Sequence, residues 1–387
     1  MLLQLYLIVV IYLYQYYMKK ILFLIPNLGH GGAERVLVNM ANNLDKKKYD
    51  VTIHSLFNEG INKKNIDFEN VNYKYSFNFK MFRGYTKILK LFTPNLLYKL
   101  LIKDTYDITV SYLEGVTARI ISADCNKTKK YGWIHIEQDN EKIFAHSFRT
   151  LNEAINCYKK FNQIICVSNT VKNDFIKLSG IKENVNVLYN INESSQIIEK
   201  GEEIIQDISF DNSIINICSV AKLMKTKGFD RLIKVHRKLL DDGLMHRIYI
   251  FGIGEEKENL KSLIEENNVA STFILAGFKE NPYKYIKQCD LYVCSSRREG
   301  FSTAVTEALI LGVPVLSTNC SGAKELLGQD NEYGIVVENS ENGLYIGLKK
   351  MLSTPDIIKE YKIKAVERGK YFSKDRRIKE VEDLFDM

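Results

Sequence analysis

The sequence has little proline and no recognisable metal-binding pattern. Five of its 387 residues are proline, so long proline-rich linkers are absent. Its six histidines form no H-E-x-x-H pattern, and the tripeptide D-x-D does not occur. The chain therefore lacks an obvious clamp for a divalent cation, and we expect no metal and no other cofactor.

Cysteine is too irregularly spaced for a disulfide framework. The seven cysteines include no C-x-x-C pair, and their number is odd. They stand at positions 125, 157, 166, 218, 289, 294 and 320. This pattern predicts buried, reduced thiols and a cytosolic chain.

The first seventeen residues carry no charge. A signal peptide would begin with basic residues and end at a small-residue cleavage site, and this stretch has neither. Its length lies at the lower limit for a membrane span. Residues 1–17 are therefore interpreted either as sequence upstream of a start at Met18 or as a short hydrophobic anchor.

The remaining composition is that of a folded protein. Hydrophobic residues make up 45% and charged residues 26% of the chain, which excludes a mostly disordered, a collagen-like or a multi-span membrane protein. At about 150 residues per domain, the length predicts two or three domains.

One segment, residues 71–103, contains basic residues and no acidic ones. Its cations equal the net charge of +7 of the whole chain; they are Lys74, Lys80, Arg83, Lys87, Lys90, Lys99 and Lys103. Large apolar residues such as Phe82, Leu91 and Phe92 lie between them. This mixture favours an anionic membrane surface as partner. Nucleic acid, which we do not expect, and a solvated lysine-rich helix pair over the core are the alternatives.

Short apolar runs alternate with helical stretches after Met18. The first series of predicted strands is Ile21–Ile25, Val51–Leu56, Ile108–Ser111, Gly132–His135, Ile164–Val167 and Val185–Leu188. The second series is Ile214–Val220, Arg247–Phe251, Thr272–Ala276, Leu291–Ser295, Val313–Ser317 and Gly334–Val337. Fully apolar strands separated by helices predict parallel sheets covered on both faces.

Two series of strands predict an α/β protein with two doubly wound domains. We place them at 18–190 and 191–371, facing a central cleft, with ligands at the carboxyl ends of the strands. The polar stretch 190–211 between the two series is interpreted as a linker and a new entry strand.

Glycine-rich turns follow two of the predicted strands. The first strand leads into Gly31 and Gly32, and a helix begins near Ala33. Because a helix N-terminus attracts phosphate, these glycines are candidates for contact with a phosphate or sugar, and a simple tight turn is the alternative. Gly252 lies in a second such turn. The first turn is not a P-loop, because no Gly-Lys-Ser/Thr follows it, and it lacks the G-x-G-x-x-G pattern of dinucleotide-binding dehydrogenases.

The loop after the predicted strand Ile214–Val220 is basic. It holds Lys222, Lys225 and Lys227. In the absence of a metal, such cations would have to neutralise a diphosphate. A solvated loop is the alternative.

Residues 297–309, R-R-E-G-F-S-T-A-V-T-E-A-L, form the most specific segment. Ser302 is expected to cap a helix that ends at Gly312 and Pro314. The N–H groups of residues 300–303 would then point to an anion site at the start of that helix.

Two carboxylates accompany this anion site. Glu299 precedes the helix, and Glu307 lies about one and a half turns into it. Carboxylates accept hydrogen bonds from sugar hydroxyls. Alternatively, Glu299 interacts with the dipole of the helix, and Glu307 pairs with a buried cation.

This segment resembles the Glu-x7-Glu motif of retaining GT-B glycosyltransferases of family 4. Its setting is S-S-R-R-E-G-F-S-T-A-V-T-E-A-L-x-x-G-V-P-V. Other landmarks follow in the order of that family, namely GGAERV, I-C-V-S-N-T-V-K, V-L-Y-N, K-T-K-G, F-G-I-G-E and A-G-F-K-E-N-P. The resemblance extends from about Met18 to the C-terminus.

The resemblance implies two Rossmann-like domains, with residues 372–387 forming a helix that crosses back to the first. It implies metal-independent transfer, with retention, of a hexose or N-acetylhexosamine from a nucleotide-diphosphate sugar, with UDP favoured. The acceptor would be a glycan or a polyprenyl-diphosphate sugar at the inner face of a bacterial plasma membrane. The product would belong to capsule, lipopolysaccharide O-antigen or another surface glycan.

The resemblance also implies roles for individual residues. Lys222 and Lys227 would bind the diphosphate, Glu307 the ribose, and Glu299 the hydroxyls of the donor sugar. The further donor-binding positions are Gly31, Gly32, Gly252, Gly300, Phe301, Ser302 and Thr303.

Two residues of the first domain complete the implied site. His135 would lie close to the reacting sugar, with a satisfied core histidine as the alternative, and Glu114 would meet the acceptor. The family usually has arginine in place of Lys222, and a lysine keeps the charge but loses the bidentate fork.

Two other functions compete with transfer. A GT-B-like epimerase would release nucleotide without an acceptor. A non-catalytic nucleotide-sugar-binding protein would be expected to lack Glu299 or the basic loop, and both are present.

Overall fold

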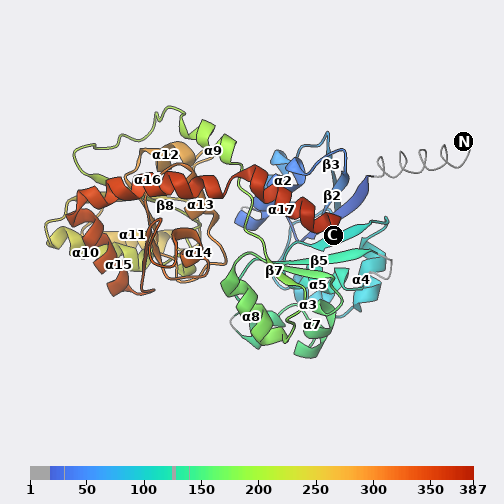
Figure 1. Cartoon of the computed structure of the whole chain (residues 1–387). Helices are drawn as coiled ribbons and strands as arrows, with labels where there is room; N and C mark the ends of the chain where they lie inside the picture. Colours follow the sequence, from blue (N-terminus) through green and yellow to red (C-terminus); the bar gives the residue numbers. More distant parts are fainter. Residues whose placement is uncertain (1–17, 30, 124–127, 139) are drawn as a thin grey trace, which may run out of the picture. The chain divides into compact units, whose positions relative to one another are not determined.

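The computed structural model describes residues 18–29, 31–123, 128–138 and 140–387. Residues 1–17, for which an upstream extension or an anchor was predicted, lie outside this range. The described chain divides into two compact units (Figure 1). The first runs up to Tyr189 and includes Ile378–Met387, and the second is Asn190–Arg377.

A parallel sheet with strand order β3-β2-β1-β4-β5-β6-β7 forms the centre of the first unit. The strands are β1 (Lys19–Ile25), β2 (Tyr49–Phe57), β3 (Val71–Phe77), β4 (Ile108–Ser111), β5 (Lys129–Ile134), β6 (Gln163–Cys166) and β7 (Val185–Val187). The helices before Tyr189 are α2 (Gly32–Asn43), α3 (Tyr85–Leu89), α4 (Pro94–Leu101), α5 (Val116–Ile121), α6 (Glu141–Phe144), α7 (Leu151–Tyr158) and α8 (Asn169–Ser179), with a 3-10 turn at Ile61–Asn65.

β3 corrects the alternative interpretation of residues 71–103 as a solvated helix pair. Val71–Phe77 pairs with β2 at the edge of the sheet, and helices α3 and α4 follow it. The cause lies in the alternation V-N-Y-K-Y-S-F, whose period of two is typical of a strand with one solvated side. Only the second half of the segment is helical.

The second unit has a parallel sheet with strand order β10-β9-β8-β11-β12-β13. The strands are β8 (Ile215–Val220), β9 (His246–Phe251), β10 (Phe273–Gly277), β11 (Leu291–Cys294), β12 (Val315–Thr318) and β13 (Ile335–Val337). The helices are α9 (Ser194–Gly201), α10 (Phe229–Asp241), α11 (Lys257–Glu266), α12 (Tyr283–Gln288), α13 (Thr303–Ile310), α14 (Ala323–Leu327), α15 (Glu341–Ser353) and α16 (Pro355–Tyr371), with a 3-10 turn at Lys225–Lys227.

The prediction of two doubly wound parallel sheets is confirmed, and each predicted strand is present with ends shifted by a few residues. The stretch 190–211 contains α9 and no entry strand, which corrects that part of its interpretation. The predicted cleft between the units stays a prediction.

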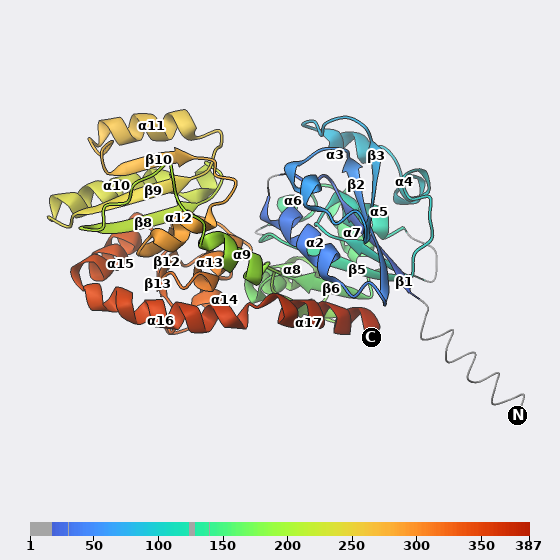
Figure 2. The same ribbon diagram turned by 90° about the horizontal axis from the view of Figure 1, so that it is seen from above.

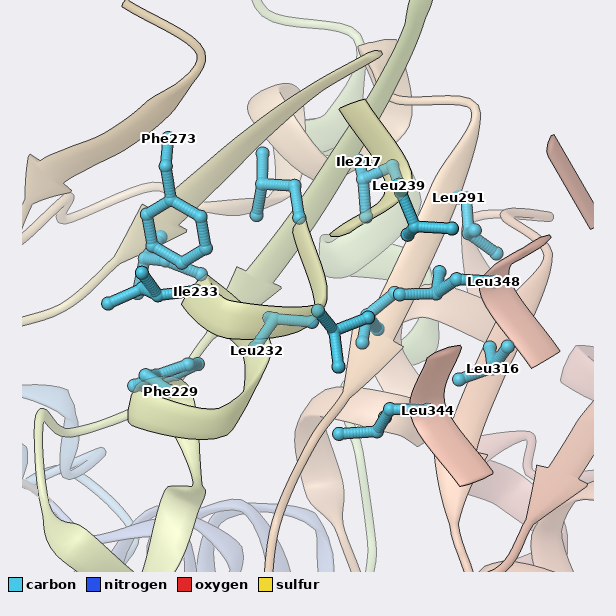
Figure 3. Packing of buried hydrophobic residues seen from close by; sticks show 14 of the residues in the cluster. Ile217, Phe229, Leu232, Ile233, Leu239, Phe273, Leu291, Leu316, Leu344 and Leu348 are labelled. Atoms are coloured by element: carbon cyan, nitrogen blue, oxygen red, sulfur yellow. The ribbon is translucent and has the colours of Figure 1, made fainter. Parts of the chain in front are cut away.

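The core of the second unit lies between its sheet and the helices α10 and α15 (Figure 3). Side chains of α10, such as Leu232 and Leu239, and of α15, such as Leu344, point toward Ile217 and Leu316 of the sheet. These strands are buried over most of their length, as in a parallel sheet that is covered on both faces, so their ends are left for polar chemistry.

Helix α17 (Lys374–Asp386) belongs in its last part to the first unit, and both views place it against that sheet (Figures 1 and 2). Phe385 is fully buried and packs against Phe23, Tyr131 and Trp133. The prediction that the chain ends in a helix crossing back is confirmed.

The six cysteines in the described residues are free thiols, and five of them are buried. Cys125, the seventh, lies outside the described residues. No helix of the described chain is long and apolar enough to cross a bilayer.

Candidate active site

In the second unit, the basic loop after β8 packs against the end of β11. Gly228, whose φ is 67°, links the 3-10 turn Lys225–Lys227 to α10. A Cβ at Gly228 would overlap the carbonyl oxygen of Ser295, so this contact requires glycine. Ser295 Oγ in turn donates to the carbonyl of Lys227 at 2.8 Å. The loop is therefore held with Lys227 beside the strand end.

Lys227 and Glu299, which were predicted separately, form an ion pair. Lys227 Nζ lies 2.7 Å from Glu299 Oε1, and the side chains are 24% and 12% exposed. Ser296 Oγ donates to the same carboxylate oxygen at 2.6 Å. Burial acts to lower the pKa of Lys227, but the Glu299 carboxylate outweighs it and holds that pKa above its ordinary value. Lys227 therefore stays charged at neutral pH.

Arg231, which the sequence analysis did not single out, binds the backbone that carries Ser296 and leads to Glu299. Its guanidinium donates to the carbonyl of Ser295 at 2.7 and 3.1 Å and to that of Ser296 at 3.0 Å. Thr318 Oγ1 donates to the same Ser296 carbonyl at 2.6 Å. Arg231 is buried, and a buried charged residue needs partners of this kind. This burial is not visible in the sequence.

Arg297 of the Glu-x7-Glu segment connects that segment to the basic loop. It forms two parallel hydrogen bonds with Asp230, at 2.6 and 2.8 Å. Its N–H also donates to the Thr226 carbonyl at 2.7 Å. These bidentate contacts fix the relative position of the two loops.

The predicted cap of α13 is confirmed. Ser302 Oγ accepts from the N–H of Val305, and the helix begins at Thr303. Gly300 directly precedes this turn and is buried. The side chain of Phe301 is also buried and packs edge-on against Phe372, so it is the backbone of this residue that a ligand would meet.

The remaining residues proposed for donor binding lie in different surroundings. Glu307 is buried within α13. Lys222 is exposed and forms no ion pair within the described residues. A Cβ at Gly252 would overlap the Ala221 carbonyl, and the Gly252 N–H donates to Gly277 at 2.8 Å. Gly252 therefore supports the loop that carries Lys222.

In the first unit, β1 leads into the glycine-rich turn. Gly31 is the N-cap of α2, which begins at Gly32, and no side chain caps this end. A Cβ at Gly31 would overlap the carboxylate of Glu34. The N-terminus of α2 thus has an acidic neighbour in its first turn, which the sequence analysis did not weigh.

His135 and Glu114, predicted from separate strand ends, lie together. Glu114 Oε2 accepts from the backbone N–H of His135 at 2.9 Å, because β4 and β5 are adjacent and parallel. The ring of Tyr112 lies 4.8 Å from that of His135. Burial lowers the pKa of His135 to about 3, so the imidazole is neutral at neutral pH. Its Nε2 has no hydrogen-bond partner within the described chain.

Within the described residues, no three histidine, cysteine, aspartate or glutamate side chains are grouped as a metal site. The described geometry therefore presents two clusters, each within its own unit. One consists of Lys227, Ser296 and Glu299, and the other of Glu114 and His135.

Two family models match the chain. The model described as "Glycosyl transferases group 1" matches residues 201–368, and that described as "Glycosyltransferase Family 4" matches residues 30–191.

Among curated relatives, the chain is 37% identical over 190 residues to the N-acetylgalactosamine-N,N'-diacetylbacillosaminyl-diphospho-undecaprenol 4-alpha-N-acetylgalactosaminyltransferase of Campylobacter jejuni. This match covers 49% of the chain and 50% of the relative, so it spans about half of either protein. An uncharacterized glycosyltransferase of Haemophilus influenzae is 27% identical over 378 residues, which is 94% of the chain and 98% of the relative.

Among solved structures, Anabaena Alr3699/HepE in complex with UDP and glucose is similar with a TM-score of 0.77 at 17% identity, covering 96% of the chain and 100% of that protein. Staphylococcus aureus TarM is similar with a TM-score of 0.74 at 15% identity, covering 96% and 100%. At these identities the likeness shows the fold.

Proposed function

We propose, on the premise that this chain is a glycosyltransferase with the GT-B fold, that it transfers a hexose or N-acetylhexosamine with retention of anomeric configuration. The observation that carries this proposal is the Lys227–Glu299 pair, which places a cation and a carboxylate 2.7 Å apart near the carboxyl ends of parallel strands. Doubly wound sheets bind their ligands at this edge. A diphosphate would meet the cation, and the hydroxyls of the donor sugar would meet the carboxylate.

We propose UDP as the carrier of the donor sugar. The similar Anabaena structure is a complex with UDP and glucose, and the resemblance to family 4 favours the same nucleotide. An N-acetylhexosamine is supported by the Campylobacter relative and by the poly(ribitol-phosphate) alpha-N-acetylglucosaminyltransferase of Staphylococcus aureus. The alpha linkages in both names agree with retention.

In the proposed mechanism, charge on the leaving diphosphate is stabilised without a metal. Lys222, Lys227 and the N–H groups at the start of α13 supply the positive potential. The acceptor hydroxyl attacks from the face that the diphosphate leaves, and a diphosphate oxygen takes its proton. His135 would form a hydrogen bond as a neutral imidazole, because burial keeps its pKa near 3. Glu114 would orient His135 by accepting from its backbone N–H.

The proposed acceptor is a polyprenyl-diphosphate-linked sugar on the cytoplasmic leaflet. The name of the Campylobacter relative includes diphospho-undecaprenol, and other relatives take part in O-antigen or colanic acid synthesis. A product of this kind would belong to a cell-surface glycan.

We also propose that the protein docks to an anionic membrane through residues 71–103. Exposed apolar side chains gather here, namely Tyr75, Phe79, Met81, Phe82, Ile88, Leu91, Phe92, Leu96 and Leu100. The rings of Phe79 and Phe82 pack against Phe57 and against each other, forming an aromatic cluster. We call residues 79–103 the basic apolar surface.

The cations of this surface, unlike the preceding Lys74, are available to lipid headgroups. Lys74, in β3, forms an ion pair of 2.6 Å with Asp104. By contrast, within the described residues no ion pair is formed by Lys80, Arg83, Lys87, Lys90, Lys99 or Lys103. Each free cation near an anionic surface contributes about 1 kcal/mol to binding, so several together give reversible, salt-sensitive docking.

A donor screen that measures released nucleotide diphosphate tests the transfer proposal. With a polyprenyl-diphosphate sugar in detergent, Glu299→Gln and Lys227→Ala should each lower kcat by at least about 100-fold. Lys225→Ala, in the same turn and exposed, should have little effect. Near-normal turnover in the first two variants would remove the pair from the site.

The same screen tests the alternatives. Activity should survive EDTA, and loss that manganese restores would contradict a metal-free mechanism. Release of nucleotide that needs no acceptor would favour an epimerase.

Flotation with anionic vesicles tests the docking proposal, using a chain that begins at Met18. Binding should be strong at low salt and should weaken when Lys80, Arg83, Lys87 and Lys90 are changed to glutamate. A chain that stays soluble would refute docking, and unchanged binding of the variant would refute the assigned surface.

A further inference from the structure

The turn between α3 and α4 has its backbone carbonyls bound by two arginines from other elements (Figure 2 shows these helices). Arg119 of α5 donates to the carbonyl of Leu89 at 3.1 Å and to that of Phe92 at 2.8 Å. Arg149 donates to the carbonyl of Lys90 at 2.6 Å and to that of Leu91 at 2.9 Å. Four successive carbonyls, residues 89–92, thus accept from guanidinium groups.

The N–H groups of this turn are satisfied as well. Those of Lys90, Leu91 and Phe92 donate to the carbonyls of residues 86, 88 and 89 at 3.1, 3.0 and 3.3 Å. The backbone of residues 90–92 therefore has a protein partner for each N–H and each carbonyl.

Three side chains of the same turn are apolar and exposed, whereas Leu89 is buried and Lys90 is charged. Leu91 is 76% exposed, and Ile88 and Phe92 are 48% and 40% exposed. A tight turn on the surface of a protein in water normally leaves its carbonyls to the solvent. This turn combines the most exposed apolar side chain of the basic apolar surface with a backbone that needs no water.

The two arginines are themselves tied together by Glu153 of α7. Arg119 donates to Glu153 Oε1 through Nε at 3.0 Å and through Nη2 at 2.9 Å. The N–H of Arg149 donates to Glu153 Oε2 at 2.5 Å. We call Arg119, Arg149 and Glu153 the brace. Because Arg119 is fully buried, the brace extends from the core of the first unit to the turn.

We propose that residues 88–92 form a preformed wedge that enters the apolar boundary of the bilayer, with Arg119 and Arg149 as positioning residues. A peptide segment can enter hydrocarbon only if its backbone hydrogen bonds are satisfied within the protein. The free cations around the turn place it against anionic headgroups. This inference rests on the docking proposal and specifies which segment passes below the headgroups.

Quenching by lipids brominated near the glycerol end of their acyl chains tests the depth of the turn. In the full chain, Leu91→Trp should lose roughly half or more of its added emission on vesicles of brominated phosphatidylcholine and phosphatidylglycerol. Ile363→Trp is the matched control, because Ile363 is also 76% exposed but lies in the second unit; its emission should not change. The native Trp133 is 2% exposed and provides an unquenched background.

Flotation of the same vesicles separates the possible failures. Binding without quenching of Leu91→Trp would overturn the wedge and leave docking intact. An absence of binding would overturn both. Equal quenching of the Leu91 and Ile363 variants would overturn the assigned segment.

Arg149 tests the brace, since its side chain is exposed and its loss spares the core. In the Leu91→Trp background, Arg149→Ala should lose most of the quenching, while Trp133 emission and turnover of a water-soluble acceptor analogue are retained. Arg149→Lys keeps the charge without the fork and should behave like the alanine variant. Unchanged quenching in Arg149→Ala would show that the arginine does not position the turn, and recovery in Arg149→Lys would assign its effect to charge.

Discussion

At Gly228, the absence of a Cβ allows the basic loop to lie against the strand end that carries the candidate carboxylate. Its φ is 67°, and a Cβ would overlap the Ser295 carbonyl. Gly228→Ala should therefore destabilise the second unit by about 1–3 kcal/mol and also lower kcat, because Lys227 would be displaced.

Gly243 provides a matched control for this prediction. Its φ is 80°, but a Cβ there would meet nothing within 4 Å. Gly243→Ala should show the backbone strain alone, with normal kcat. Urea denaturation and steady-state kinetics measure both effects, and equal losses in the two variants would contradict the packing argument.

At the scale of elements, α10 and β9 are joined by a buried histidine pair. His236 Nδ1 lies 2.8 Å from His246 Nε2, and His236 Nε2 lies 2.8 Å from Thr272 Oγ1. Burial lowers the pKa of His236 to about 3 and also lowers the pKa of His246. The imidazole of His236 is therefore neutral in the folded protein over most of the acidic range.

This pair should make stability depend on pH. The unfolded state, with a histidine pKa of about 6.5, binds more protons than the folded state below that pH. The free energy of unfolding should therefore fall as pH decreases from about 6.5 toward 3, by up to about 1.4 kcal/mol per pH unit from His236, and the lowered pKa of His246 acts in the same direction. Urea midpoints across this range measure the slope.

His236→Asn should reduce that slope, because an amide does not titrate, while His135, whose pKa is also lowered to about 3, keeps its own contribution. His146→Asn, a change at an exposed histidine, should leave it unaltered. A slope that stays the same in the His236 variant would assign the pH dependence to other groups.

At the scale of the whole molecule, the last turns of the chain complete the core of the first unit. Phe385 is fully buried against aromatic residues of β1, β2 and β5. Phe385→Ala should cost about 3–5 kcal/mol of stability in that unit. Its ring lies 6.3 Å from that of Trp133, so the emission of this tryptophan follows the transition. Met387→Ala, at a position that is 72% exposed, should leave it unchanged.

Local sequence patterns were sufficient to predict most strands of the two sheets and the cap of α13. Strands such as Ile108–Ser111 are uncharged and buried because both faces are covered, and this short, uncharged and mostly β-branched run is visible without knowing what covers it. Ser302 was recognisable as a cap because its acceptor role depends only on residues within the same turn. β3 also follows a local alternation, but Lys74 had been counted among the cations of one basic segment, for which a helix pair was an alternative.

The sequence by itself determined the fold class, the strands other than β3 and the Glu-x7-Glu segment, since each shows in a pattern of neighbouring residues. Only the tertiary structure decided that Lys227 pairs with Glu299, that Glu114 holds the backbone of His135, and that Arg119 and Arg149 brace one exposed turn. These contacts join residues far apart in the chain. Their partners are set by which strand ends and helices the sheet order brings side by side, and that order is a property of packing that no local pattern records.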